Sequence, residues 1–168
     1  SENIEILEGL EPVRKRPGMY IGGIDTKAYH HLVIEILDNS IDEVINNFAT
    51  NIEVELFNND TVQITDNGRG IPVDPHPKFK NKSALEIILT TLHSGGKFNS
   101  ENYQTSGGLH GVGASVVNAL SDKFVIEVIR EKKIYRQEYS KGLPITKLLI
   151  VSETIKSNGT KILFTPDK

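Results

Sequence analysis

The C-terminal part of the sequence is a run of strand candidates joined by short turns, and this arrangement limits the fold to a sheet with antiparallel neighbours. The candidates are KFVIEVIR (123–130), KIYRQEYS (133–140), ITKLLIVSE (145–153) and TKILFTPD (160–167). The intervening turns carry residues such as Gly142-Leu143-Pro144 and Ser157-Asn158-Gly159. Strands linked in this way pair with antiparallel neighbours. A doubly wound parallel sheet needs regular strand–helix alternation, which this order lacks.

The N-terminal part adds helices and one hairpin. Apolar residues recur at spacings of three and four from about Ala28 to Phe48, which predicts a helix whose buried stripe is Val33, Ile36, Leu37, Ile41, Val44 and Phe48. The alternating segments 51–57 and 61–67 predict a hairpin that turns at Asn58, Asn59 and Asp60.

Two further helices are expected. One covers SALEIILTTLHSGG (83–96), with Ser83 as its N-cap and Gly95 beyond its end, and the other covers VGASVVNALSD (112–122). Helices on one face of a mainly antiparallel sheet define an α+β fold, a two-layer α/β sandwich. Residues 1–168 are long enough for a single domain of this kind.

Composition excludes several classes of protein. The chain is 38% hydrophobic and 24% charged and has no cysteine, so disulfides and thiolate metal sites are excluded and a reducing cytoplasm is the expected compartment. No apolar run is long enough to span a membrane. A net charge of −3 argues against a protein that is basic throughout and binds nucleic acid by itself.

The polar side of the first helix is unusual in chemistry. His31, Glu35, Asp38, Asn39 and Asp42 fall within an arc of roughly 100° on a regular helix. A solvated helix face is the simple explanation. Lysine, however, is missing from this face, and Glu35 and Asn39 are one turn apart. A carboxylate and an amide at this spacing can orient a water molecule and chelate a hard cation.

Two glycine-containing segments add candidates. DNGRG (66–70) ends the second strand of the hairpin, and it is either a simple turn or a place where Asp66 accepts a hydrogen bond from a ligand amine. QTSGGLHGVG (104–113) is either a flexible linker or a loop whose backbone N–H groups bind phosphate at a helix start. It is not a Walker A loop, and neither a zinc site nor a nucleophilic hydrolase is supported.

Five segments in this order resemble one known family. They are RKRPGMYIG (14–22), IEILDNSIDE (34–43), DNGRGIPV (66–73), LHSGGKF with SGGLHGVGASVVNALS (92–98 and 106–121), and GT (159–160). Together they resemble the N-terminal ATPase domain of the B subunits of bacterial type IIA topoisomerases. This family lies in the GHKL superfamily with Hsp90, histidine kinases and MutL, and the resemblance covers practically the whole chain.

The resemblance implies a role for each matching residue, with ATP and Mg²⁺ as cofactors. Glu35 matches the general base that activates water, His31 the residue that orients it, and Asn39 the Mg²⁺ ligand. Asp66 matches the residue that accepts from the adenine amine, with Thr160 sharing a bridging water. Further nucleotide contacts are implied beside the base, on the lid and at the rim: Arg69, Gly70, Ile71, Pro72, Lys97, Tyr103, Gly107, Gly108, Leu109, His110, Gly111, Val112, Gly113 and Arg130.

The resemblance also implies a larger protein and its partners. Family members form homodimers of B subunits, work with an A subunit on double-stranded DNA, and bind aminocoumarin inhibitors at the ATP site. The N-terminal arm looks trimmed and the transducer domain is not in the sequence, so we expect a fragment that binds nucleotide with low turnover and little dimerisation.

Alternatives stay open at this point. GLEPVRKRPGMY (9–20) and the segment 73–98 look more like the topoisomerase IV branch, which relaxes and decatenates DNA, than the gyrase branch, which supercoils it. A chaperone or mismatch-repair clamp of the same fold is a second hypothesis. A structural sandwich with a glycine linker is a third.

Overall fold

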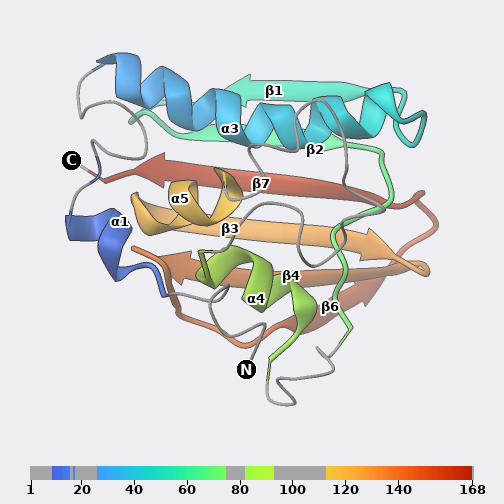
Figure 1. Ribbon diagram of the computed structural model, residues 1–168. Coiled ribbons are helices and arrows are strands. Elements are labelled where there is room, and N and C mark those ends of the chain that lie inside the picture. Colours follow the sequence, from blue (N-terminus) through green and yellow to red (C-terminus); the bar gives the residue numbers. More distant parts are fainter. Residues whose placement is uncertain (1–8, 16, 18–25, 75–81, 93–112, 168) are drawn as a thin grey trace, which may run out of the picture.

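A computed structural model describes residues 9–15, 17, 26–74, 82–92 and 113–167 (Figure 1). Within this part, one seven-stranded sheet forms a layer, and the helices lie over one of its faces (Figure 1). The predicted two-layer arrangement of helices on a sheet is therefore confirmed. None of the helices in the described ranges is long and apolar enough to cross a membrane.

The strands are short and close to the predicted segments. Their bounds are β1 Ile52–Leu56, β2 Val62–Asp66, β3 Ser121–Arg130, β4 Lys133–Ser140, β5 Leu143–Pro144, β6 Leu149–Glu153 and β7 Gly159–Pro166. The single strand expected over 145–153 is wrong in its first half. There the backbone N–H of Ile145 donates to Glu138 O at 2.8 Å, and strand β6 begins only at Leu149. Just before this segment, Leu143–Pro144, expected as part of a turn, makes a two-residue strand against β4.

The strand order is β1-β2-β7-β3-β4-β5, with β6 also paired to β4. All these pairs are antiparallel. The last strand, β7, lies between β2 and β3. It therefore joins the β1–β2 hairpin to the strands β3 to β6, although it is far from the hairpin along the chain. This insertion places Thr160 directly opposite Asp66.

The three predicted helices are shorter than expected: α3 covers Thr26–Ile45, α4 Ala84–Thr90 and α5 Gly113–Ala119. A further short helix, α1 Glu11–Lys15, was not predicted. Ser83 caps α4 as expected, because its Oγ accepts from the N–H of Glu86 at 3.0 Å. The helix ends at Thr90 rather than running on, since the hydroxyls of Thr90 and Thr91 bond back to the carbonyls of Glu86 and Ile87 and Thr91 is extended.

Helix α3 lies along β1 and β2, and α5 lies over β7 and β3 (Figure 1). The core between helices and sheet includes Ile64, Phe124, Ile126, Tyr139 and Phe164. Strand β2 alternates buried and half-buried residues, which directs Val62, Ile64 and Asp66 toward the helix layer.

The predicted buried stripe of α3 is partly wrong. Ile36 is buried and Val33 and Leu37 pack against the core, but Ile41, Val44 and Phe48 are exposed. The buried line instead runs through Leu32, Ile36 and Ser40, which are spaced four residues apart. Phe48 lies beyond the helix, which ends at Ile45.

Candidate functional site

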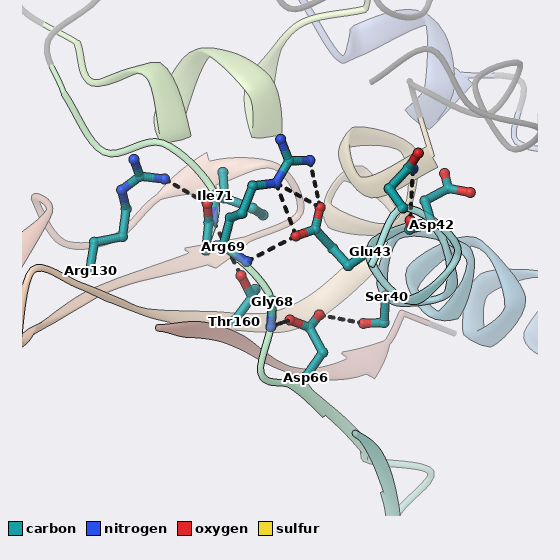
Figure 2. Close-up of polar contacts among 11 residues, drawn as sticks. Ser40, Asp42, Glu43, Asp66, Gly68, Arg69, Ile71, Arg130 and Thr160 are labelled. Carbon is teal, nitrogen blue, oxygen red and sulfur yellow. Dashed lines mark hydrogen bonds and ion pairs between the residues drawn. The ribbon is translucent and has the colours of Figure 1, made fainter. Parts of the chain in front are cut away.

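Asp66 is the last residue of β2, and its carboxylate is buried between the sheet and α3. The residue is 8% exposed. The hydroxyl of Ser40 donates to Asp66 Oδ2 at 2.6 Å, and the backbone N–H of Gly68 donates to Oδ1 at 2.9 Å (Figure 2). A carboxylate has about four lone-pair positions, so these two bonds and the backbone hydrogen bond from Thr160 hold it and still leave acceptor capacity for a ligand.

The pKa of Asp66 is raised above its ordinary value. Burial is the largest cause, and the negative charge of Glu43 adds to it. The hydrogen bonds from Ser40, Gly68 and the Thr160 backbone oppose the rise because they favour the charged form. A buried acidic group with opposed influences of this kind is a frequent mark of a functional site.

Strand β7 approaches Asp66 closely. Thr160 is its register partner, and the Thr160 Oγ1 accepts from the N–H of Ile71 at 3.2 Å (Figure 2). A side chain at Gly159 would meet the Asp66 carbonyl, so only glycine lets the two backbones lie so near each other. Thr160 therefore fixes the segment after β2 in place, in addition to its predicted role beside the base.

The segment after β2 is also clamped to α3. Glu43 accepts from the Arg69 guanidinium at 2.6 Å and from the Arg69 backbone N–H at 2.9 Å (Figure 2). The same guanidinium lies 3.9 Å from the centre of the Phe48 ring. An arginine held by a carboxylate and an aromatic face is oriented rather than mobile.

Gly70 and Arg130 meet on the far side of this segment. Gly70 has φ +85°, a conformation that favours glycine, and an added Cβ would lie 3.0 Å from side-chain atoms of Arg130 and Val128. Arg130 donates to the Gly70 carbonyl at 2.8 Å (Figure 2). The sequence-predicted residues Asp66, Gly70, Ile71, Arg130 and Thr160 are thus brought together.

Glu35 lies on α3 against the start of α5. A Cβ on Gly113 would overlap Glu35 Oε1, so the glycine makes room for the carboxylate. Asn39, one turn later, is half-buried, whereas His31, one turn earlier, is exposed. The structure therefore brings Glu35 and Gly113 together and places Asn39 on the same side of the helix as Glu35.

Among the other predicted contacts, Pro72 follows Ile71 and is half-buried. The remaining predicted nucleotide contacts lie outside the described residues; these are Lys97, Tyr103, Gly107, Gly108, Leu109, His110, Gly111 and Val112.

Three residues around the site were missed by sequence reasoning. They are Ser40, which donates to Asp66, and Glu43 and Phe48, which contact Arg69. The sequence assigned no role to Ser40, and it placed Phe48 on the buried stripe of the helix. One signal for Ser40 was present in the sequence. It is a polar residue four positions after Ile36, on the buried line of the helix. A buried hydroxyl at such a position needs a hydrogen-bond partner.

The fold is that of a known class of protein. The family described as histidine kinase-, DNA gyrase B- and HSP90-like ATPase matches residues 24–168. The chain belongs to this family of ATPases, which confirms the predicted resemblance.

Individual relatives point to the topoisomerase members. The chain is 59% identical to the B subunit of DNA topoisomerase 4 from Rickettsia bellii, over 99% of its own length and 25% of that protein. It therefore spans about a quarter of this curated relative.

Two solved structures are similar throughout the chain. The topoisomerase IV ATP-binding domain of Francisella tularensis, in complex with a small-molecule inhibitor, has a TM-score of 0.82 and 42% identity, over 96% of this chain and 74% of that one. The 43K ATPase domain of Thermus thermophilus gyrase B, in complex with an aminocoumarin, also has a TM-score of 0.82, with 46% identity over 98% and 41%. The chain is therefore similar in sequence as well as in fold to the ATPase domains of gyrase B and topoisomerase IV.

Proposed function

We propose that this chain binds ATP between α3 and the segment that follows β2, with Asp66 accepting a hydrogen bond from the adenine amine. The observation that carries the proposal is the buried Asp66 carboxylate, held by Ser40 and Gly68 with acceptor positions to spare. An unpaired buried carboxylate is costly, so a site built around one is suited to a ligand that donates. The exocyclic amine of adenine is such a donor.

Hydrolysis is proposed to occur at the other end of the site, where Glu35 is the general base that takes a proton from the attacking water. Gly113 sets its position because a side chain there would displace the carboxylate. His31 is proposed to assist the orientation of Glu35.

Asn39 is proposed as the protein ligand of Mg²⁺. The donor chemistry fits, because Mg²⁺ prefers oxygen ligands and usually takes few from the protein, keeping waters and substrate phosphates. The described residues hold no group of three or more His, Cys, Asp or Glu that could bind a metal by themselves. When bound, Mg²⁺ would neutralise phosphate charge.

The remaining predicted contacts stay proposals. The backbone from Gly107 to Gly113 is proposed to cover the phosphates, with Lys97 and Tyr103 as further contacts. Arg69, Gly70, Ile71 and Pro72 are proposed to lie beside the base, Thr160 to share a water with Asp66, and Arg130 to form the rim where aminocoumarins bind. The clamp of Arg69 by Glu43 supports a positioned arginine.

For the whole protein, we propose the B subunit of a cytoplasmic topoisomerase IV, of which residues 1–168 are one ATPase domain. It would act as a homodimer with an A subunit on double-stranded DNA, using ATP to drive strand passage, relaxation and decatenation. Gyrase B is the alternative, since the gyrase B domain of Thermus thermophilus is equally similar in structure. Reconstitution of the full-length protein with its A subunit separates these, because decatenation without supercoiling identifies topoisomerase IV.

Calorimetric titration with a non-hydrolysable ATP analogue tests the nucleotide proposal directly. Saturable binding that an aminocoumarin displaces is expected, because the gyrase domain with the same fold was solved with such a compound. Absence of saturable binding at millimolar analogue would reject it and leave the hypothesis of a structural sandwich.

A further inference from the structure

Ser40 is a polar residue at a buried helix position, where an apolar side chain is usual. It follows Leu32 and Ile36 along the buried line of α3 and is only 4% exposed. A hydroxyl buried there without a partner would destabilise the chain. Its partner is Asp66 Oδ2 at 2.6 Å, a length typical of a hydrogen bond to an ionised carboxylate (Figure 2).

The hydrogen bond restricts the orientation of the Asp66 carboxylate. Gly68 holds Oδ1 from the segment after β2, and Ser40 holds Oδ2 from the helix, so the two oxygens are fixed from two different elements. Without Ser40, the remaining donors are the backbone groups of Gly68 and Thr160, and the carboxylate gains freedom to turn about its Cβ–Cγ bond, a torsion with broad preferences.

We propose that Ser40 is a positioning residue that sets the base specificity of the site, by holding Asp66 as an oriented hydrogen-bond acceptor for an amine. The inference rests on the proposed function of Asp66 as the adenine contact. An oriented, charged acceptor favours a base that presents an amine and disfavours one that presents a carbonyl oxygen at the same place. Adenosine carries the amine and inosine a carbonyl oxygen at this place. The ratio of their affinities therefore reports how well the Asp66 carboxylate is oriented as an acceptor.

The electrostatic surroundings give Ser40 a specific role. The charged group that acts on Asp66 is Glu43 on α3, which is repulsive and is itself paired with Arg69. Of the groups that favour the ionised carboxylate, Ser40 contributes most, ahead of the backbone donors of Gly68 and Thr160. A site that lost this hydroxyl would accept more weakly and discriminate less.

The test compares Ser40→Ala with Ser121→Ala in the 168-residue chain. Ser121 is a matched control because it is also fully buried, but its hydroxyl bonds to Val117 O, away from the site. Affinities for the imido analogues of ATP and of inosine triphosphate are measured by calorimetry, with thermal unfolding of each variant alongside.

Ser40→Ala is expected to weaken binding of the ATP analogue by about tenfold and to reduce the ATP-to-inosine preference by a similar factor. Ser121→Ala should leave that preference within about twofold of the parent, as remote deletions do. Equal losses for both analogues, or no loss for either, would assign Ser40 a structural role and overturn the inference.

An Asp66→Ala background separates this inference from the proposed function. Asp66→Ala alone should abolish the preference for the ATP analogue, and adding Ser40→Ala should then change nothing further. If Asp66→Ala leaves binding of the ATP analogue intact, the proposed function itself fails. If it weakens binding while Ser40→Ala does not alter the preference, only the role of Ser40 is rejected.

Discussion

The two halves of α3 contribute to the site in different ways. The C-terminal half is tied to the segment after β2 by side-chain bonds from Ser40 to Asp66 and from Arg69 to Glu43. The N-terminal half presents Glu35, whose position is limited by the close approach of Gly113 from α5. The proposed base-binding end is thus held by side-chain hydrogen bonds between α3 and the segment after β2, and at the proposed hydrolytic end α3 and α5 approach each other closely.

This difference predicts separable defects. Substitutions at the hydrogen-bonded end should change affinity and base preference, and those at the helix contact should change turnover.

Glu35→Gln should reduce kcat for ATP hydrolysis by about 10²–10⁴, the range for loss of a general base, with analogue affinity almost unchanged. Phosphate release by the full-length protein measures kcat, and calorimetry measures affinity. Asp38→Asn on the same helix is a suitable control for loss of one negative charge. Retention of more than about a tenth of the parent kcat would contradict the assignment of Glu35.

Asp66→Asn should weaken binding of the ATP analogue by about 1–3 kcal/mol, since the amide nitrogen cannot accept from the adenine amine. In the same variant, kcat at saturating ATP should fall much less than in Glu35→Gln. Calorimetry and steady-state kinetics provide the two numbers. A variant that bound normally but did not turn over would show that the two ends are not separable.

Gly113→Ala should reduce kcat by about tenfold, because the new methyl group overlaps the Glu35 carboxylate and must displace it. Gly9→Ala is a matched control, since a Cβ at Gly9 meets nothing within 4 Å. Thermal unfolding separates a shifted carboxylate from a general loss of packing. Unchanged kcat in a folded Gly113→Ala protein would show that Glu35 is not positioned by this contact.

The pKa of Asp66 makes stability depend weakly on pH. Because burial raises this pKa from 3.8, the native chain takes up the proton more readily than the unfolded chain. The stabilising contribution is complete below pH 3.8 and is lost as the pH rises through the higher folded-state pKa. The expected slope is at most about 1.4 kcal/mol per pH unit.

Urea unfolding of the parent and of Asp66→Asn at a series of pH values measures this contribution. The difference between the two free energies of unfolding should change across that window and become constant above it. A constant difference from low pH upward would show that Asp66 has an ordinary pKa in the folded chain.

Much of the fold could be predicted from the sequence because its signals are local. Ser83 caps α4, positive φ values at Asn59 and Asp60 form the hairpin turn, and alternation defines β2. The insertion of β7 between β2 and β3 could not be predicted, because strand pairing at long range leaves no local pattern. The end of α4 at Thr90 was missed because hydroxyl-to-carbonyl bonds competed with helix propensity.

For the site, the sequence supplied candidates. Motif resemblance pointed to Glu35, Asn39, Asp66 and Thr160, whose roles stay predictions, but not to Ser40 and Glu43, which contact the candidate segment. Glu43 and Ser40 act through contacts with Arg69 and Asp66, about 26 residues away along the chain. Their roles depend on how α3 crosses β2, which no helical periodicity encodes.

The antiparallel class of the sheet, the N-cap of α4 and the residue types available for chemistry could be read from the sequence, because they follow from local backbone preferences and side-chain pattern. Which of those residues meet depends on the tertiary structure. It joined Asp66 to Ser40 and Thr160, and Glu35 to Gly113, because packing of α3 and α5 on the sheet brings together groups that are far apart in the chain.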